Sequence, residues 1–327
     1  MGTKQTVLEF LEKNRGTAVS GEALASKIGV SRFAVCKAIK TLKSDGYNIE
    51  SVTNKGYTLQ KNSDVLTVET LKNGLCKELQ NVSINVFNEV TSTNILAKEA
   101  AAKGENDCPN GSIFLANRQT GGHGRRSRAF FSPSGGIYLS FVLRPTLEIA
   151  KTVCLTSCAA VAVTRAIKTV CNIDTNVKWV NDIFYNGKKL CGILTEAAVS
   201  IENNTLEYAV IGIGINFFMP TCDVPKELQN VITAIYTEKP DGEIRTRLVC
   251  EICNNLFFLE QTPDSKEILA EYKALNFIID KKITVLSMPP KTAVARDINE
   301  LGNLIVEYEN GEIGVISSGE VSIKPLQ

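Results

Sequence analysis

The chain has 327 residues, more than one ordinary domain contains, so two or three domains are expected. Hydrophobic residues make up 44% of the chain and charged residues 22%, a composition that excludes a largely disordered protein. The net charge is only +1, so any attraction to nucleic acid or to a membrane must come from a local cluster of charges.

Cysteine usage and hydropathy predict a cytoplasmic protein. The ten cysteines are scattered, and no signal-peptide pattern precedes them. Cys250 and Cys253 are spaced like half of a redox or zinc site, but they fall in a helical pattern that favours burial. The longest apolar run, Tyr208–Pro220, is short for a membrane helix and contains Asn216. No membrane association is therefore expected.

Residues 1–64 predict a helix-turn-helix. Three segments carry apolar residues at helical spacing, and they are Val7–Leu11, Leu24–Ile28 and Val35–Leu42. Ser20 and Ser31 stand where N-caps of the second and third helices are expected. Gly29 lies between these two helices and permits a tight turn.

A wing and a basic surface favour DNA as the ligand of residues 1–64. After Gly46, Tyr47–Glu50 and Gly56–Gln60 are predicted strands around a turn at Asn54-Lys55. The segment holds ten basic and six acidic residues. Entry of the third helix into the major groove would bring Ser31, Arg32, Lys37 and Lys40 to the DNA. The alternative is a helical module whose basic face is solvated or contacts protein.

Residues 66–275 mix strands and helices, which predicts an α+β multidomain protein with a mixed α/β central domain. The predicted strands are Asn85–Phe87, Ser112–Ala116, Ile137–Leu143, Val177–Trp179, Asp182–Tyr185, Cys191–Glu196 and Glu207–Phe217. The predicted helices are Ala97–Ala102, Ile149–Thr169 and Arg245–Gln261. Neither a Walker A motif nor a G-x-G-x-x-G after a strand is present, so the common phosphate-binding loops are excluded.

A glycine- and arginine-rich segment, residues 121–130, is named here the Gly/Arg loop. It reads Gly-Gly-His-Gly-Arg-Arg-Ser-Arg-Ala-Phe. Glycines let backbone N–H groups approach an anion, and arginines add forked cationic donors for phosphate. The loop should order when an anion binds. The alternative is a solvated surface loop with a cluster of charges.

Two further patches follow the Gly/Arg loop. Asn186-Gly187 predicts a hairpin turn between Lys178–Tyr185 and a returning strand that begins near Lys189. Ile211–Asn216 alternates isoleucine and glycine, which leaves one face of a strand open to a flat ligand. Each of these patches alone is better explained by plain sheet packing.

In chain order these segments resemble the motifs of biotin protein ligases. The matching segments are Ser92-Thr93-Asn94, the Gly/Arg loop, Lys178–Asp182, Lys189–Gly192 and Gly212–Asn216. With the predicted winged helix, the chain resembles the bacterial family that is both a biotin ligase and the biotin operon repressor. The related lipoate ligases share the catalytic fold, but the winged helix and the Lys-Trp-x-Asn-Asp patch favour biotin.

The resemblance implies where biotin binds. Residues implied to contact biotin are Ser92, Thr93, Asn94, Gln119, Gly122, His123, Gly124, Arg125, Lys189, Gly192, Gly212 and Gly214. In the family, the residues matching Ser92–Asn94 and Gln119 contact the ureido ring. The Gly/Arg loop closes over biotin and its adenylate.

The resemblance also implies a nucleotide site and two catalytic residues. Residues implied to contact ATP or the adenylate are Arg125, Arg126, Arg128, Phe130, Lys178, Asn181, Asp182 and Asn216. Lys189 and Arg125 are the implied catalytic residues, and Lys189 would touch the activated carboxylate. Asp182 is the candidate for Mg²⁺, which would bind through the nucleotide.

Four positions depart from the family pattern. His123 replaces an arginine of the loop, which exchanges a fixed charge for a titratable one. Ser127 replaces a loop glycine, Phe130 replaces a tryptophan and Val180 replaces a proline. The histidine bears on how tightly the adenylate is retained, while the reaction class is unaffected.

Residues 276–327 predict five short strands, which are Lys282–Ser287, Thr292–Ile298, Leu304–Tyr308, Glu312–Ser317 and Glu320–Ile323. The resemblance implies that they form an SH3-like barrel. The expected domains are therefore a winged helix (1–64), a ligase domain (66–275) and the small β domain (276–327).

The expected function is ATP-dependent ligation of biotin to the biotin carboxyl carrier protein, combined with repression at the biotin operator by a ligand-dependent homodimer. Two alternatives remain open at this point. One is a ligand-sensing repressor without ligase turnover, and the other is a ligase of the lipoate class.

Overall fold

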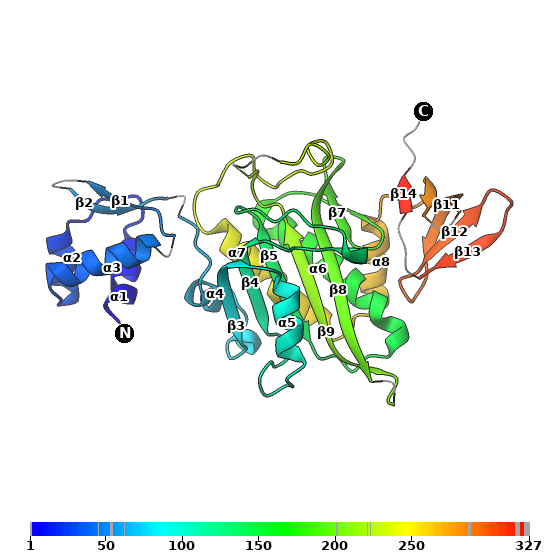
Figure 1. The fold of residues 1–327 in the computed structure, drawn as a ribbon, viewed down its shortest axis with the longest axis horizontal. Coiled ribbons are helices and arrows are strands. Elements are labelled where there is room, and N and C mark those ends of the chain that lie inside the picture. Colours follow the sequence, from blue (N-terminus) through cyan, green and yellow to red (C-terminus); the bar gives the residue numbers. More distant parts are fainter. Residues whose placement is uncertain are drawn as a thin grey trace.

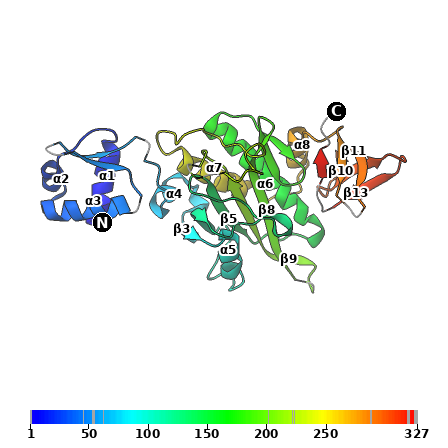
Figure 2. The same cartoon turned by 45° about the horizontal axis from the view of Figure 1, so that its top comes forward.

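The computed structural model describes residues 2–44, 46–52, 55–61, 63–200, 202–220, 222, 224–286, 289–317 and 321–323. Three parts lie in a row, with the N-terminal helices at one end, a large sheet with its helices in the middle, and a small sheet at the other end (Figures 1 and 2).

The N-terminal part is a winged helix. Its elements are α1 (Thr3–Lys13), α2 (Gly21–Ile28), α3 (Arg32–Ser44), β1 (Ile49–Val52) and β2 (Gly56–Leu59). The Ser20 hydroxyl accepts a hydrogen bond from the N–H of Ala23 at 3.0 Å, and the Ser31 hydroxyl accepts one from the N–H of Ala34 at 3.2 Å. Both predicted caps are therefore confirmed, and Gly29 ends α2 in the left-handed conformation that the turn requires.

The wing begins two residues later than its sequence pattern indicates. The first strand runs over Ile49–Val52, because Tyr47 is buried against the helices and takes part in their core. The strands β1 and β2 pair antiparallel. Asn54, at the predicted turn, lies outside the described residues.

The central sheet has seven strands in the order β3-β4-β5-β9-β8-β7-β6. They are β3 (Ile84–Val90), β4 (Ile113–Gln119), β5 (Ile137–Leu143), β6 (Asn176–Lys178), β7 (Asp182–Tyr185), β8 (Lys188–Ser200) and β9 (Thr205–Ile215). Among these seven described strands, only β3 and β4 pair parallel. The fold is thus the mixed α+β arrangement that the sequence predicts.

Helices cover both faces of this sheet. Helix α5 (Thr93–Ala101) packs on one face, where it meets Phe114, Val142 and Val210. The opposite face carries α6 (Thr152–Cys171), with α4 (Val68–Gly74), α7 (Ile244–Leu259) and α8 (Lys266–Leu275) around it. The isoleucines of Ile211–Ile215 belong to the core under α6. The intervening Gly212 and Gly214 therefore face the α5 side, as strand alternation requires.

Helices α8 and α4 were not predicted, although the sequence carries capping residues at the start of each. Helix α8 begins after Ser265, whose hydroxyl accepts from the N–H of Ile268 at 3.2 Å, and it buries Ile268 and Tyr272 at helical spacing. Helix α4 begins with a capping box at Thr67. Short 3₁₀ turns also occur at Lys77–Leu79, Arg125–Ser127 and Ile149–Lys151.

The prediction that Tyr208–Pro220 is the longest apolar run was wrong. The segment Ile149–Cys171 is long and apolar enough to cross a membrane, with a mean hydropathy of 1.4, whereas Tyr208–Pro220 forms β9 and the loop after it. Two thirds of the apolar window of Ile149–Cys171 is buried inside the protein. Its hydropathy is accounted for by its place as the core helix between the sheet, α7 and α8.

The C-terminal part is a five-stranded antiparallel sheet in the order β13-β12-β11-β10-β14. Its strands are β10 (Lys282–Val285), β11 (Lys291–Ile298), β12 (Leu304–Tyr308), β13 (Ile313–Ile316) and β14 (Val321–Ile323). Its buried side chains continue the core of the central part. The indole of Trp179 donates a hydrogen bond to the carbonyl of Gly302 at 2.9 Å, so the single tryptophan fastens this sheet to the central one.

A buried aspartate joins the winged helix to the central part. The Asp64 carboxylate accepts hydrogen bonds from the N–H of Arg245 at 2.8 Å and from the hydroxyl of Thr246 at 3.0 Å. Arg245 in turn donates to the Asp64 carbonyl at 2.9 Å. Asp64 is 2% exposed and Arg245 is 8% exposed. The chain leaving the wing is therefore held at the first turn of α7.

The substitution Asp64→Ala should lower the free energy of unfolding by about 2–4 kcal/mol, because buried donors at the start of α7 lose their charged acceptor. Urea denaturation measures this change. Asp241, an exposed aspartate shortly before α7, provides the matched control. Asp241→Ala should change the free energy of unfolding by less than about 0.5 kcal/mol. Equal small effects for the two variants would contradict the structural role of Asp64.

Candidate active site

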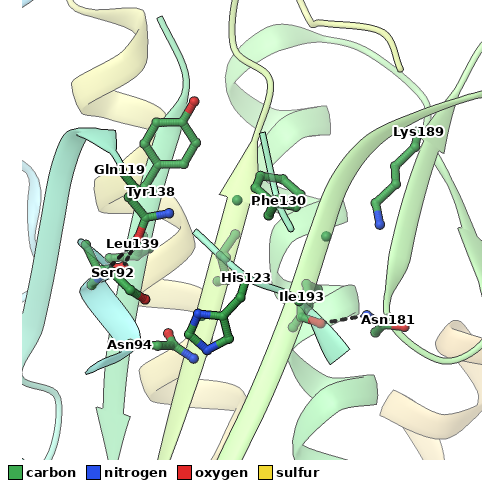
Figure 3. A pocket seen from close by; sticks show the side chains of 16 residues that line it. Ser92, Asn94, Gln119, His123, Phe130, Tyr138, Leu139, Asn181, Lys189 and Ile193 are labelled. Carbon is green, nitrogen blue, oxygen red and sulfur yellow. Dashed lines mark hydrogen bonds between the residues drawn. The ribbon is translucent and has the colours of Figure 1, made fainter. Parts of the chain in front are cut away.

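A pocket opens on the α5 side of the central sheet, at the N-terminus of α5. Segments far apart in the sequence meet there: the start of α5, the end of β4, the Gly/Arg loop, β5, and the strands β8 and β9 (Figure 3). The lining residues are Ser92, Thr93, Asn94, Gln119, His123, Gly124, Phe130, Tyr138, Leu139, Asn181, Lys189, Gly192, Ile193, Gly212, Ile213 and Gly214.

Glycines form the floor of this pocket. A Cβ atom at Gly212 would lie 2.2 Å from Oδ1 of Asn94, and one at Gly214 would lie 2.4 Å from the ring of Phe130. A Cβ at Gly192 would lie 3.1 Å from the same ring. The glycines do leave one face of the sheet bare, as the sequence indicates. In this structure the side chains of Asn94 and Phe130 lie on that face.

The Gly/Arg loop folds back on itself as a hairpin. The N–H of Phe130 donates to the carbonyl of Gly122 at 2.9 Å, and the N–H of Gly124 donates to the carbonyl of Arg128 at 2.8 Å. A Cβ at Gly122 would lie 2.8 Å from the Phe130 carbonyl oxygen, so this glycine is needed to close the hairpin. At the tip Arg126 takes a left-handed φ of 55°. The hairpin brings Phe130 over the glycine floor.

A chain of hydrogen bonds crosses the pocket wall from β4 to β8. Oε1 of Gln119 accepts from the N–H of Thr93 at 2.8 Å. The fully buried hydroxyl of Ser140 lies 2.8 Å from the Thr93 hydroxyl and 2.5 Å from Oδ1 of Asn94. The Asn94 amide then donates to Oε2 of Glu196 at 2.9 Å. Both ends of that amide are therefore held, and its orientation is fixed.

The chain of hydrogen bonds ends at Glu196, which belongs to a small cluster of charged side chains. Nζ of Lys98 lies 2.6 Å from Oε1 of Glu196, and Nε2 of His123 lies 3.9 Å from Oε2. Burial alone would raise the pKa of the Glu196 carboxyl, but hydrogen bonds from Lys98 and Asn94 and the charges of Lys98 and His123 hold that pKa below its usual value. Glu196 is therefore ionised at neutral pH.

Lys189 is presented to the pocket by a tight hairpin. The turn between β7 and β8 has Asn186 at φ 49° and Gly187 at φ 73°, the left-handed pair expected for an Asn-Gly turn. Nζ of Lys189 lies 2.6 Å from Oδ1 of Asp182 and 5.9 Å from the centre of the Phe130 ring. A cation thus points to the place where the loop, the floor and Asn181 meet (Figure 3).

The structure brings most of the implied biotin-contacting residues together. Those of them that line the pocket are Ser92, Thr93, Asn94, Gln119, His123, Gly124, Lys189, Gly192, Gly212 and Gly214. Gly122 and Arg125 are outside the lining. Gly122 closes the hairpin, and Arg125 begins the turn at its tip.

The implied nucleotide residues are less tightly gathered. Phe130 and Asn181 line the pocket, whereas the other implied residues, Arg125, Arg126, Arg128, Lys178, Asp182 and Asn216, lie outside its lining. The Asn216 amide donates to the carbonyl of Thr233 at 3.0 Å. Asp182 pairs with Lys189, which lines the pocket. The three arginines lie on the Gly/Arg loop, outside the pocket lining.

Sequence reasoning missed several residues of the site. These are Tyr138, Leu139, Ile193 and Ile213 in the lining, and Ser140, Glu196 and Lys98 behind it. Ser140 and Glu196 belong to predicted strands, but which residues they meet depends on the pairing of β5 with β9 and of β9 with β8. A single sequence does not reveal that register.

The described residues contain no group of three or more His, Cys, Asp or Glu side chains placed to hold a metal ion. Asp182 is already paired with Lys189. The donors therefore do not fit a Mg²⁺ site built from protein side chains alone.

Three of the residues implied for DNA contact lie on α3, and Ser31 directly precedes this helix. Arg32, Lys37 and Lys40 are exposed. Ser31 is exposed as well, although its hydroxyl accepts the capping hydrogen bond from Ala34.

The pocket combines features suited to joining a carboxylate to a nucleotide. It has a fixed amide, a bare glycine floor, a lysine and an arginine-bearing loop. Cations and N–H groups of this kind stabilise charge that develops at phosphorus.

Models of three known families match the chain. A biotin/lipoate A/B protein ligase family matches residues 86–216, an HTH domain matches residues 3–58, and a biotin protein ligase C terminal domain matches residues 278–324. The last two matches fall on the winged helix and the small sheet.

Known proteins agree with these assignments. The bifunctional ligase/repressor BirA of Bacillus spizizenii is 37% identical over 253 residues, which is 76% of each chain. The BirA of Escherichia coli is 28% identical over 94% of each chain. The structure of a biotin protein ligase from Aquifex aeolicus in complex with biotin and ATP has a TM-score of 0.59 at 26% identity, and covers 74% of this chain and 98% of its own. The winged helix, the pocket and these similarities together place the chain in the family of bifunctional biotin ligase/repressors.

Proposed function

We propose that this chain converts biotin and ATP to biotinyl-5′-AMP in the pocket beside α5, and then transfers the biotin to a lysine of the biotin carboxyl carrier protein. One observation carries the proposal. All five segments that resemble the ligase motifs contribute residues to a single pocket, and Lys178–Asp182 does so through Asn181. The related Aquifex aeolicus ligase, solved with biotin and ATP, supports the same pair of substrates.

Biotin would lie with its ureido ring at the start of α5. That ring presents two N–H donors and one carbonyl acceptor, and the side chains of Ser92, Thr93, Asn94 and Gln119 offer matching groups. Because the hydrogen-bond chain through Ser140 and Glu196 fixes the Asn94 amide, this side chain is oriented before biotin arrives. The biotin tail then runs over the glycine floor toward Lys189.

In the first half-reaction a carboxylate oxygen of biotin attacks the α-phosphorus of ATP. A P–O bond forms, the bond to the β-phosphate breaks, and pyrophosphate leaves. Lys189 would neutralise the carboxylate and the α-phosphate as they approach, and Arg125, Arg126 and Arg128 would hold the phosphates from the loop. The Phe130 ring would offer its face to the adenine, with Asn181 beside it.

In the second half-reaction the amine of the carrier lysine attacks the acyl carbon of the mixed anhydride. An amide forms, AMP leaves, and the attacking nitrogen loses a proton. No protein nucleophile is required. The Gly/Arg loop, as it closes on the adenylate, would keep water from hydrolysing the anhydride.

Mg²⁺ is proposed to enter as the companion of the ATP phosphates. It prefers phosphate and water oxygens to a cage of side chains, and Asp182 is the carboxylate that would stand closest to it. The cytoplasm is the proposed compartment, and the ten free thiols support it. We also propose the domain limits 1–64, 66–275 and 276–327.

The substitution Lys189→Ala should lower the rate of adenylate formation at least about 10²-fold, because the cation beside the reacting oxygens is lost. Pyrophosphate release with biotin and ATP, without carrier protein, measures this step. Lys188 is the matched control, since it precedes Lys189 on β8 and lies outside the pocket lining. Lys188→Ala should stay within about threefold of the wild type. Near wild-type release by Lys189→Ala would refute the assigned role.

The substitution Glu196→Gln should raise the KM for biotin by about tenfold and change kcat much less, because the Asn94 amide exchanges its charged acceptor for a weaker neutral one and is held less firmly. Glu207→Gln, an exposed change on the neighbouring strand β9, provides the control and should leave KM unchanged. A fall in kcat at unchanged KM would show that Glu196 does not act through Asn94.

The regulatory half of the proposal is a biotin-responsive repressor of the biotin synthesis genes. The adenylate orders the loop, favours a homodimer, and pairs two winged helices with two operator half-sites. Sedimentation velocity should then show a dimer when biotin and ATP are added together, and tighter binding to operator DNA should accompany it. Unchanged sedimentation and DNA affinity would exclude this mode of regulation.

A repressor without turnover is the remaining alternative. Incubation with ATP, biotin and a biotin carboxyl carrier domain separates it from the proposed ligase. The mass of the carrier domain should increase by one biotin, and an unchanged mass would favour the repressor alone.

A further inference from the structure

One side chain of the winged helix is unusually exposed. Phe33 is 80% exposed, more than any other large hydrophobic side chain among the described residues. An aromatic ring so open to water is seldom kept for folding, because its burial would be favourable. Phe33 is absent from the winged-helix core, which the other side of α3 supplies through Val35, Ile39 and Leu42.

Phe33 lies at the N-terminal end of the exposed face of α3. It is the second residue of this helix, two positions after the Ser31 cap. Lys37 lies one turn further along and Lys40 two turns further, and both are exposed on the same face as Phe33. Helix α3 carries four basic residues and no acidic one. This surrounding charge matches a polyanion and disfavours an apolar protein partner.

The wing stands beside the same face. The Cys36 thiol lies 3.2 Å from the Tyr57 hydroxyl of β2, and Nζ of Lys43 donates to the hydroxyl of Ser51 on β1 at 2.9 Å. Both contacts tie α3 to the wing. Phe33 is thus carried on a rigid, capped helix and not on a loop.

We propose that Phe33 reads a thymine in each DNA half-site, by packing its ring on the 5-methyl group in the major groove. Lysines that contact phosphates attract duplexes of any sequence and carry no base information. An apolar ring gains nothing from a phosphate, and the thymine methyl is the apolar group that the major groove presents. The proposal rests on the DNA binding proposed above and adds a residue that determines sequence preference.

The test uses the full chain with biotin and ATP, and duplexes selected by it from a random-sequence library. Each thymine of the selected site is replaced singly by deoxyuridine, which removes only the methyl group. We expect one position per half-site at which wild-type affinity falls about fourfold, the factor that corresponds to about 0.8 kcal/mol for one buried methyl-sized group. Phe33→Ala should bind the thymine duplex about fourfold more weakly than wild type and should not distinguish thymine from deoxyuridine at that position.

Lys37→Ala is the matched control from the same face. It should weaken binding to both duplexes equally and should reduce the salt dependence of binding, whereas Phe33→Ala should leave the salt dependence unchanged. An unfolding midpoint equal to that of the wild type would show that Phe33→Ala folds.

The outcomes are distinguishable. Failure to select any duplex would refute the repressor function itself. Selection of a site at which no deoxyuridine replacement matters to the wild type would overturn the role of Phe33 while leaving DNA binding intact. Loss of ligand-dependent dimerisation in Phe33→Ala would instead assign the ring to a contact between two copies of the chain, and would also overturn the proposal.

Discussion

The site depends on three positions where the sheet has no side chain. Gly192, Gly212 and Gly214 leave β8 and β9 bare on the α5 side, and a Cβ at Gly212 or Gly214 would collide with Asn94 or Phe130. The same stretch of β9 packs Ile211, Ile213 and Ile215 under α6. One face of β9 therefore packs in the core. Its other face contacts the Gly/Arg loop and the start of α5. Any side chain at these glycines would displace the groups proposed to hold biotin and adenine.

Charge is arranged around this floor in two separate pairs. Lys189 is balanced by Asp182 at one end, and Lys98 is balanced by Glu196 at the other. The first pair leaves a cation at the place where the two anionic substrates are proposed to meet. The second fixes the amide of Asn94 where the neutral ureido ring would lie. His123 of the Gly/Arg loop lies beside Glu196 of β8, at a position where the resemblance implies an arginine.

Local patterns sufficed to predict the winged helix and the central strands, whereas most of the residues that line the pocket were implied by the resemblance to biotin protein ligases. Ser20, Ser31 and Gly29 act where their caps and turn were expected, and Asn186-Gly187 makes the expected hairpin. Contacts between distant segments were beyond the sequence. The junction of Asp64 with Arg245 and the network through Ser140 depend on tertiary packing and strand register. The composition of α6 suits a membrane as well as a core, and only its burial separates the two.

The central claim is that the Gly/Arg loop closes over an adenylate lying on the glycine floor. A crystal structure of the protein grown with biotin and ATP tests it most directly. Biotinyl-5′-AMP should lie across Gly192 and Gly214, with Nζ of Lys189 at hydrogen-bond distance from the acyl phosphate and residues 121–130 packed over it. A loop turned away from the ligand, or biotin bound on another surface, would contradict the proposed mechanism.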